Sequence, residues 1–78
     1  MKRFYVDVVH DGAITFLVGP FADETSARRR EIEAAKYAMS HGHMSPFDSV
    51  GVTSIEGSFK APGNLNRHFE LADGELLT

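Results

Sequence analysis

Two stretches near the start of the chain alternate between apolar and polar positions, and a turn signal separates them. Residues 3–9 and 13–19 place β-branched or aromatic side chains at every second position, and a period of two is typical of strands. The dipeptide Asp11-Gly12 lies between the two stretches and favours a tight hairpin turn. The pattern therefore predicts a β-hairpin over residues 3–19.

The register of this hairpin depends on the length of its loop. A two-residue loop would pair His10 with Ala13 and would divide the apolar side chains between the two faces of the ribbon. A three-residue loop would instead pair Val9 with Ala13, with Gly12 in the left-handed conformation of a G1 bulge. The second register gathers six large apolar side chains on one face: Phe4, Val6, Val8, Ile14, Phe16 and Val18. We therefore expect a type I turn with a G1 bulge.

The stretch that follows the hairpin changes to a helical period. Asp23 is the expected N-cap and Gly42 the expected stop of a helix over residues 24–41. The apolar stripe of this helix is mostly alanine, which lets a helix approach a sheet closely: Ala27, Ala34, Ala35 and Ala38, extended by Ile32 and Met39. Arg28 and Glu31 fall within the stripe, so either the two pair or the Arg28 stem covers the edge of the core. We expect this end of the helix to extend beyond the sheet.

Weaker patterns follow the helix. Residues 41–48 are interpreted as a loop from which Phe47 returns to the core, and residues 50–56 as a third strand. Val50 and Val52 alternate out of phase with Ile55, so we expect a small bulge near Gly51 or Ser54 in that strand.

Residues 65–71 alternate between apolar and polar side chains once more. We interpret them as a short fourth strand, with a single helical turn as the alternative, and we expect residues 72–78 to fray. Together the elements predict a single α+β domain over residues 1–78. It consists of a small antiparallel sheet, made of the hairpin and one or two further strands, with one helix packed on one face.

Composition narrows the class of protein. The 78 residues suffice for one small domain, and they include no cysteine that would form a disulfide or a thiolate metal site. The first residues lack the apolar run of a signal peptide, and no stretch is as long and apolar as a membrane span. The net charge of −3, from 8 basic and 11 acidic side chains, argues against direct nucleic-acid binding. We therefore expect a cytoplasmic protein that does not enter a membrane.

The sequence contains no catalytic, cofactor-binding or metal-binding motif. His41 and His43 flank a glycine, and His68 or Asp48 could add a further ligand, but a two-histidine loop is more often a solvated turn. The serines on either side of Asp48 lack the strand–turn–helix context of a nucleophile elbow. We expect no enzymatic activity, no cofactor and no resident metal.

Two surfaces are candidates for binding a partner, namely the outer face of the helix and the sheet face that the helix leaves bare. Exposed arginine beside tyrosine is typical of interface hot spots, although a solvated charged face is the plain alternative. An uncovered sheet face would form an apolar patch, and edge strands could pair across a dimer. The predicted partner-binding residues, four on the helix and two on the sheet, are Arg29, Arg30, Lys36, Tyr37, Tyr5 and Leu17.

Several short motifs occur in an order that resembles small proteins encoded by bacteriophages and prophages of proteobacteria. They are Gly19-Pro20-Phe21 after the hairpin, an alanine-rich helix after Asp23, Phe47-Asp48-Ser49-Val50-Gly51-Val52 at the third strand, and Gly63-Asn64-Leu65-Asn66 near the end. The arginine segment 28–30 departs from this pattern, because such proteins tend to have more alanine there. Within this group the chain looks like an anti-CRISPR protein.

The resemblance implies stoichiometric binding rather than catalysis. Anti-CRISPR proteins generally occupy a surface of the bacterial effector complex, and against type I systems a common mode is to bind the surveillance complex and block access to target DNA. The resemblance therefore implies a non-enzymatic inhibitor in the cytoplasm of a bacterial host, acting as a monomer or homodimer. The alternatives are a self-associating phage accessory or structural protein and a small nucleic-acid-binding regulatory module.

Overall fold

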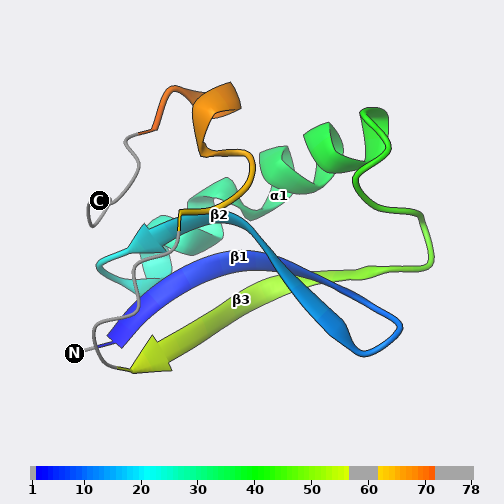
Figure 1. Cartoon of the computed structure of the whole chain (residues 1–78). Coiled ribbons are helices and arrows are strands. Elements are labelled where there is room, and N and C mark those ends of the chain that lie inside the picture. Colours follow the sequence, from blue (N-terminus) through cyan, green and yellow to red (C-terminus); the bar gives the residue numbers. More distant parts are fainter. Residues whose placement is uncertain (1, 57–61, 72–78) are drawn as a thin grey trace.

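The computed structural model describes residues 2–56 and 62–71, which form a three-stranded antiparallel sheet with one long helix (Figure 1). In chain order the elements are β1 (Lys2–His10), β2 (Ala13–Phe21), α1 (Glu24–Ser40), β3 (Ser49–Glu56) and a 3-10 turn, η1 (Asn66–Phe69). The strand order is β2-β1-β3, so the first strand of the chain lies in the centre of the sheet. The predicted α+β class is confirmed.

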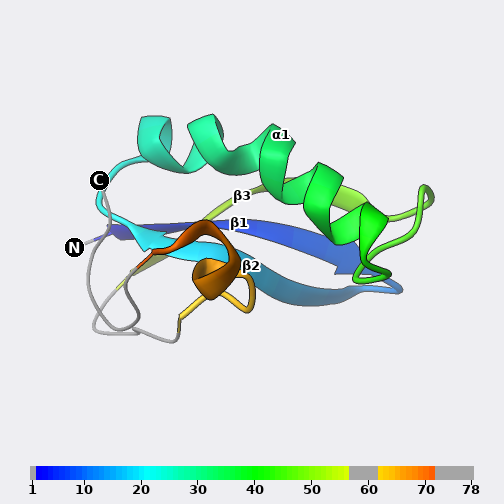
Figure 2. The ribbon, with the colours of Figure 1, turned by 90° about the horizontal axis from the view of Figure 1, so that it is seen from above.

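The helix packs against one face of the sheet through its alanine stripe (Figure 2). Ala27, Ala34 and Ala38 are fully buried, and their small side chains allow the helix backbone to approach the strands closely. The strand residues that meet them in the core are Val6, Val8, Leu17, Val18 and Phe21. The predicted contact between an alanine-lined helix and the sheet is therefore present.

Both ends of α1 are capped as the sequence predicts. The Asp23 carboxylate accepts a hydrogen bond of 2.8 Å from the backbone N–H of Ser26, and this bond lowers the pKa of Asp23. At the other end, Gly42 has a φ of 76°, and the N–H of His43 donates to the carbonyl oxygen of Ala38 at 2.7 Å. This is the hydrogen bond of a Schellman motif, which ends the helix at a residue free to adopt a positive φ.

The turn of the hairpin differs from the expected one. Asp11 and Gly12 both have positive φ, 49° and 79°, so the turn is a two-residue type I′ turn. His10 consequently pairs with Ala13. The predicted type I turn with a G1 bulge is wrong, because aspartate tolerates the left-handed conformation and the I′ turn matches the twist of the strands.

The ribbon is irregular at two places in β2 instead of at the turn, because β2 carries an extra residue between the Asp7–Phe16 and Val6–Val18 pairs and another between the Val6–Val18 and Phe4–Phe21 pairs. Val6 therefore faces the helix whereas Phe16 points to the opposite side, where its ring stacks on Tyr5 with centroids 4.3 Å apart. The expected gathering of six apolar side chains on one face is wrong.

The third strand contains no bulge. β3 pairs with β1 without interruption from one end to the other, so Val50 and Val52 face the helix and Ile55 lies on the other face, half-buried. A bulge is not needed to bring Ile55 onto the same face as Val50 and Val52, because the sheet buries side chains on both faces. Tyr5, on the face away from the helix, is 0% exposed.

The segment after β3 forms a helical turn, and the preferred interpretation of residues 65–71 as a strand is wrong. Leu65 and Asn66 are consecutive and both buried, at 1% and 0% exposed, which a strand covered on one face does not allow. The Asn66 amide accepts a hydrogen bond from the Gly19 N–H at 3.0 Å and donates one to the Gly19 carbonyl oxygen at 2.6 Å. The alternative of a single helical turn is thus correct, and the expected fraying of residues 72–78 lies outside the described residues.

Candidate interaction surface

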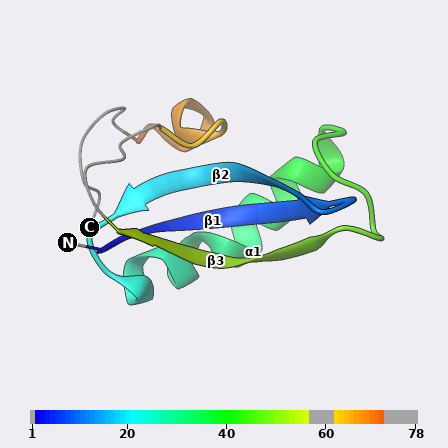
Figure 3. The same ribbon diagram turned by 60° about the horizontal axis from the view of Figure 1, so that its bottom comes forward.

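The helix crosses the sheet obliquely. Figure 3 looks onto the sheet face away from the helix and shows α1 starting beyond the β3 edge and ending behind β2. On the way α1 contacts all three strands. The crossing leaves a wedge on each side of the helix, one beside the start of β3 and one beside the end of β2.

The start of α1 extends beyond the sheet, as its charged residues led us to expect. Arg28 is about half exposed, and its Nε lies 2.9 Å from the Glu24 carboxylate. A second contact of 3.6 Å joins Arg28 to Glu31 one turn later. Of the two alternatives for Arg28, the pairing with Glu31 is therefore the one that is present, and neither charge is buried in the core.

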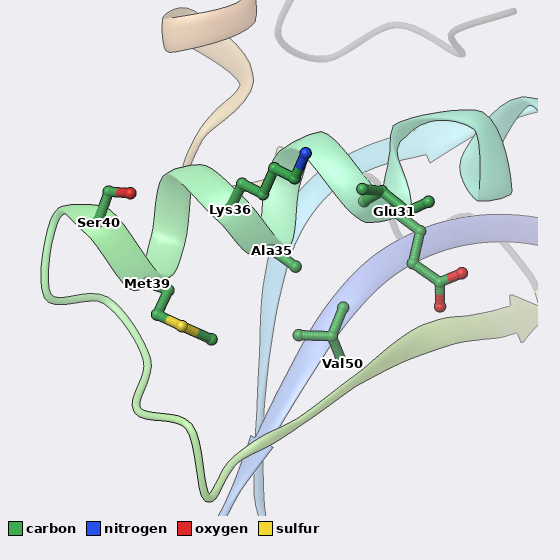
Figure 4. Close-up of a pocket in the computed structure, with 7 residues that line it drawn as sticks. Glu31, Ala35, Lys36, Met39, Ser40 and Val50 are labelled. Carbon is green, nitrogen blue, oxygen red and sulfur yellow. The ribbon is translucent and has the colours of Figure 1, made fainter.

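The wedge beside β3, here called the apolar wedge, is a groove of about 540 Å³ (Figure 4). In Figure 4 the side chains of Ala35 and Met39 project from α1 toward the side of the helix on which Val50 lies. Ile32 is 69% exposed and Met39 is 46% exposed. Among the described residues, the apolar wedge is lined by Glu31, Ile32, Ala35, Lys36, Met39, Ser40 and Val50. Exposed apolar side chains gathered beside a hollow are typical of an interaction site.

The wedge beside the end of β2, here called the polar wedge, has about half that volume, near 260 Å³. Its lining consists of Phe21, Ser26, Arg29, Arg30 and Glu33. Arg30 pairs with Glu33. Arg29 is exposed, and no carboxylate of residues 2–56 or 62–71 lies within ion-pair distance of it. A guanidinium in this position suits a carboxylate or phosphate oxygen supplied by a partner.

The predicted partner-binding residues do not form one surface. Arg29 and Arg30 line the polar wedge, whereas Lys36, two helical turns after Arg29, lines the apolar wedge. Tyr5 and Leu17 are 0% and 2% exposed, so the bare sheet patch that we expected from them is absent. Leu17 lies at a bulge of β2 and turns into the core, and the Tyr5 ring is covered in part by its stacking partner Phe16.

Tyr37 lies in a cluster of rings near the end of α1, half-buried, and not on the open polar side. Its hydroxyl is 2.7 Å from Nδ1 of His68, and its ring stacks on His41 with centroids 3.9 Å apart. The ring centroids of His43 and Phe69 lie 6.4 Å and 5.7 Å from that of Tyr37. The spacing of Tyr37 and His41, one helical turn apart, signals their contact, but nothing local signals the contact with η1.

The histidines of this cluster do not form a metal centre. Within the described ranges, no group of three or more His, Cys, Asp or Glu side chains is placed to hold a metal ion. Nδ1 of His41 lies 3.0 Å from the Tyr37 carbonyl oxygen. Asp48, which the sequence offered as a further ligand, is bound instead to His10 at 2.5 Å.

Phe47 is 96% exposed, so the expectation that it returns to the core is wrong. The Ser45 N–H donates to the Asp48 carboxylate at 2.9 Å, and the Asp48 N–H donates to the Ser45 carbonyl oxygen at 3.0 Å. The Phe47 N–H donates to Oγ of Ser45 at 3.3 Å. These bonds close a tight turn, and Phe47 is held at its tip as an exposed aromatic side chain.

His10 connects the hairpin to this turn through a titratable contact. The hydrogen bond to Asp48 raises the pKa of His10, and the pKa of Asp48 is lowered, chiefly by the backbone N–H of Ser45 and then by His10. A raised histidine pKa contributes stability below the unfolded value of about 6.5, and this contribution is lost as the pH rises through the folded pKa.

The variant His10→Gln is therefore expected to melt a few degrees below the wild type in mild acid. The difference in Tm should be largest near pH 5, above the unfolded pKa of Asp48 of about 3.9, where both charges are present. It should disappear by about pH 9, where His10 is neutral in either state. Thermal unfolding followed by circular dichroism across this range measures the difference. A deficit independent of pH would contradict the assignment.

No family model, curated protein or solved structure matches this chain. The two wedges, the ring cluster and the exposed Phe47 are therefore the ground for a functional proposal. Among the described helices, none has the length and apolar character needed to cross a membrane.

Proposed function

We propose that this protein is a non-enzymatic inhibitor that binds a type I CRISPR surveillance complex of a bacterial host and blocks its binding of target DNA. The observation that carries the binding role is the polar wedge, in which Arg29 is exposed and has no ion-pair partner among the described residues. The identity of the partner is supported by the resemblance of the motifs at Gly19-Pro20-Phe21 and residues 63–66 to those of small phage proteins.

The polar wedge suits an acidic patch on a protein partner. Arginine offers a planar fork of donors that pairs with a carboxylate through two hydrogen bonds, and it is enriched at interface hot spots. The pair of Arg30 with Glu33 holds one guanidinium beside the wedge, so less side-chain freedom is lost on binding. The net charge of −3 disfavours a phosphate backbone as the partner of this surface.

The double variant Arg29→Glu and Arg30→Glu is expected to lose inhibition. Replacing both cations by carboxylates should weaken binding by at least about tenfold, since like charges would then face the acidic patch. The measurement titrates the variant against purified type I surveillance complexes and follows target-DNA binding by gel shift. The Tm should change little, because the substitutions are on the helix surface and remove only an exposed ion pair.

Lys36→Glu is the matched control, because it reverses a cation on the same helix but on the side of the apolar wedge. This variant should inhibit as the wild type does. Failure of the wild type to bind any type I complex would remove the proposal. A large fall in the Tm of the double variant would instead identify the two arginines as structural.

A further inference from the structure

We infer that a second copy of this chain occupies the apolar wedge, and that the two copies pair antiparallel through their β3 strands. The apolar wedge and the polar wedge share no lining residue, and Arg30 lies on the opposite face of α1 from Ile32, so a dimer leaves Arg30 available. The inference goes beyond the proposed function and does not depend on it.

The first observation is an open strand edge. β3 has one neighbour in the described sheet, β1, so the backbone groups on its outer edge between Ser49 and Ile55 have no strand partner in the described part of the chain. Natural proteins protect such edges with proline, lysine, bulges or very short strands. β3 is eight residues long, is regular along its length, and contains neither proline nor lysine. It is therefore suited to pairing with another strand.

The second observation is that the overhang of the helix and the apolar wedge are complementary in position. The start of α1 lies beyond the second half of β3, whereas the wedge lies beside its first half (Figure 3). In an antiparallel β3 pair related by a two-fold axis, the second half of one strand lies beside the first half of the other. The overhanging start of each helix then lies over the wedge of the other copy.

This arrangement favours a second copy of the chain, and not an unrelated protein, as the occupant of the apolar wedge. The occupant has to supply an open strand edge and, at a fixed distance from it, a helix that projects past that edge. The chain itself supplies both. Pairing about a two-fold axis perpendicular to the sheet also keeps both helices on the same face. The exposed side chains of Ile32 and Met39 are then covered by the partner helix.

The charges at the rim of the wedge are self-complementary as well. Each wedge carries one carboxylate, Glu31, which also lies 3.6 Å from Arg28 of its own helix, and one ammonium, Lys36. Suppose that the two-fold axis passes beside α1 between Glu33 and Ala34, so that the two helices run antiparallel. Glu31 of each copy then lies beside Lys36 of the other copy. Ile32 of each copy likewise lies over Ala35 of the other. Both charge pairs of the interface are then of opposite sign.

Sedimentation equilibrium of the intact chain, at concentrations from about 1 to 100 µM around the micromolar Kd of a small interface, tests the dimer. The wild type should approach twice the 8.6 kDa of the chain. Ile32→Glu should reduce dimerisation by at least about tenfold, because it places a charge among apolar contacts. Ile32 is already 69% exposed, so its fold should be kept, which circular dichroism verifies. Arg30→Glu, which lies on the opposite face of α1 from Ile32 and lines only the polar wedge, is the matched control and should remain dimeric.

A charge swap distinguishes self-pairing from general stickiness. Glu31→Lys alone and Lys36→Glu alone should each dissociate, because each variant brings two pairs of like charge together. An equimolar mixture of the two variants should recover the dimer, since each lysine then meets a glutamate. A monomeric wild type at the highest concentration, a dimer indifferent to Ile32→Glu, or a mixture that stays monomeric would overturn the inference. The sedimentation masses test the dimer separately from the proposed inhibition, so the effect of the double arginine variant on inhibition neither supports nor contradicts the dimer.

Discussion

Replacing Gly63 by alanine is expected to lower the free energy of unfolding by about 3 kcal/mol. A Cβ at this position would lie 2.5 Å from Val18 Cα and 2.6 Å from the carbonyl carbon and oxygen of Leu17. These are backbone atoms of β2, so the strand or the segment after β3 has to move. Movement weakens the hydrogen bonds that residues 63–65 donate to β2. The loss is a large part of the stability of a domain of this size, about 4–12 kcal/mol.

Urea denaturation followed by circular dichroism measures this loss, with Gly51→Ala as the matched control. The nearest atom to a Cβ at Gly51 is a carboxylate oxygen of Asp7 at 3.8 Å, which is an ordinary contact. The control should therefore unfold within about 0.5 kcal/mol of the wild type. Equal losses in both variants would show that the close approach at Gly63 is not the cause.

Asn66→Ala should cost about 2–3 kcal/mol. The Asn66 side chain is fully buried, and its amide forms both hydrogen bonds to the backbone of Gly19, at 3.0 Å and 2.6 Å. Alanine removes the Asn66 partner of the Gly19 N–H in a buried site, leaves the Gly19 carbonyl oxygen with the bond from the Gly63 N–H alone, and leaves a cavity beside them. For a domain of this length such a loss lowers the Tm by roughly 10–20 °C, which differential scanning calorimetry measures.

Asn64→Ala is the control for this variant. Asn64 is exposed, and its backbone N–H, which alanine retains, makes the bond of 2.9 Å to the Phe16 carbonyl oxygen. The control should melt within a few degrees of the wild type. A small effect of Asn66→Ala would mean that water satisfies the Gly19 backbone and that the amide does not hold the segment.

Signals that act within a few residues made most of the elements predictable. Asp23 caps the helix and Gly42 ends it because each determines the conformation of its own turn. The alanine stripe at Ala27, Ala34 and Ala38 depends only on helical period, and it identified the face that meets the sheet. These features need no knowledge of distant parts of the chain.

The hairpin register was not predictable from the same reasoning because the sheet is buried on both faces. A single buried face favours the register that gathers all large apolar side chains together, as we expected. In the fold Tyr5 and Asp7, on the face away from the helix, are 0% and 3% exposed. The hydroxyl of Thr53 donates to the Asp7 carboxylate there. Because the face away from the helix is buried as well, large apolar side chains did not have to gather on one face, and the register that we expected had no advantage.

The candidate site depended on contacts across the chain. Arg29, Arg30 and Lys36 were found as charged helix residues, but the oblique path of α1 separates them into two wedges, and no pattern in one helix specifies its crossing angle. Asn66 appeared as an ordinary polar residue because its partner, Gly19, is distant in sequence. Phe47 was assigned to the core from its type, whereas hydrogen bonds in its own turn hold it in solvent.

The central place of β1 has a consequence for synthesis on the ribosome. One edge of β1 pairs with β2 as soon as the short hairpin has emerged, but the other edge pairs with residues as late as Glu56, which lies opposite Lys2. Until then the nascent chain presents an open, largely hydrophobic strand to its surroundings. Pairing between such distant residues also slows folding relative to helical proteins of similar size. Translation that stops before residue 49 yields a hairpin and helix with the middle strand uncovered, which is a substrate for chaperones and proteases.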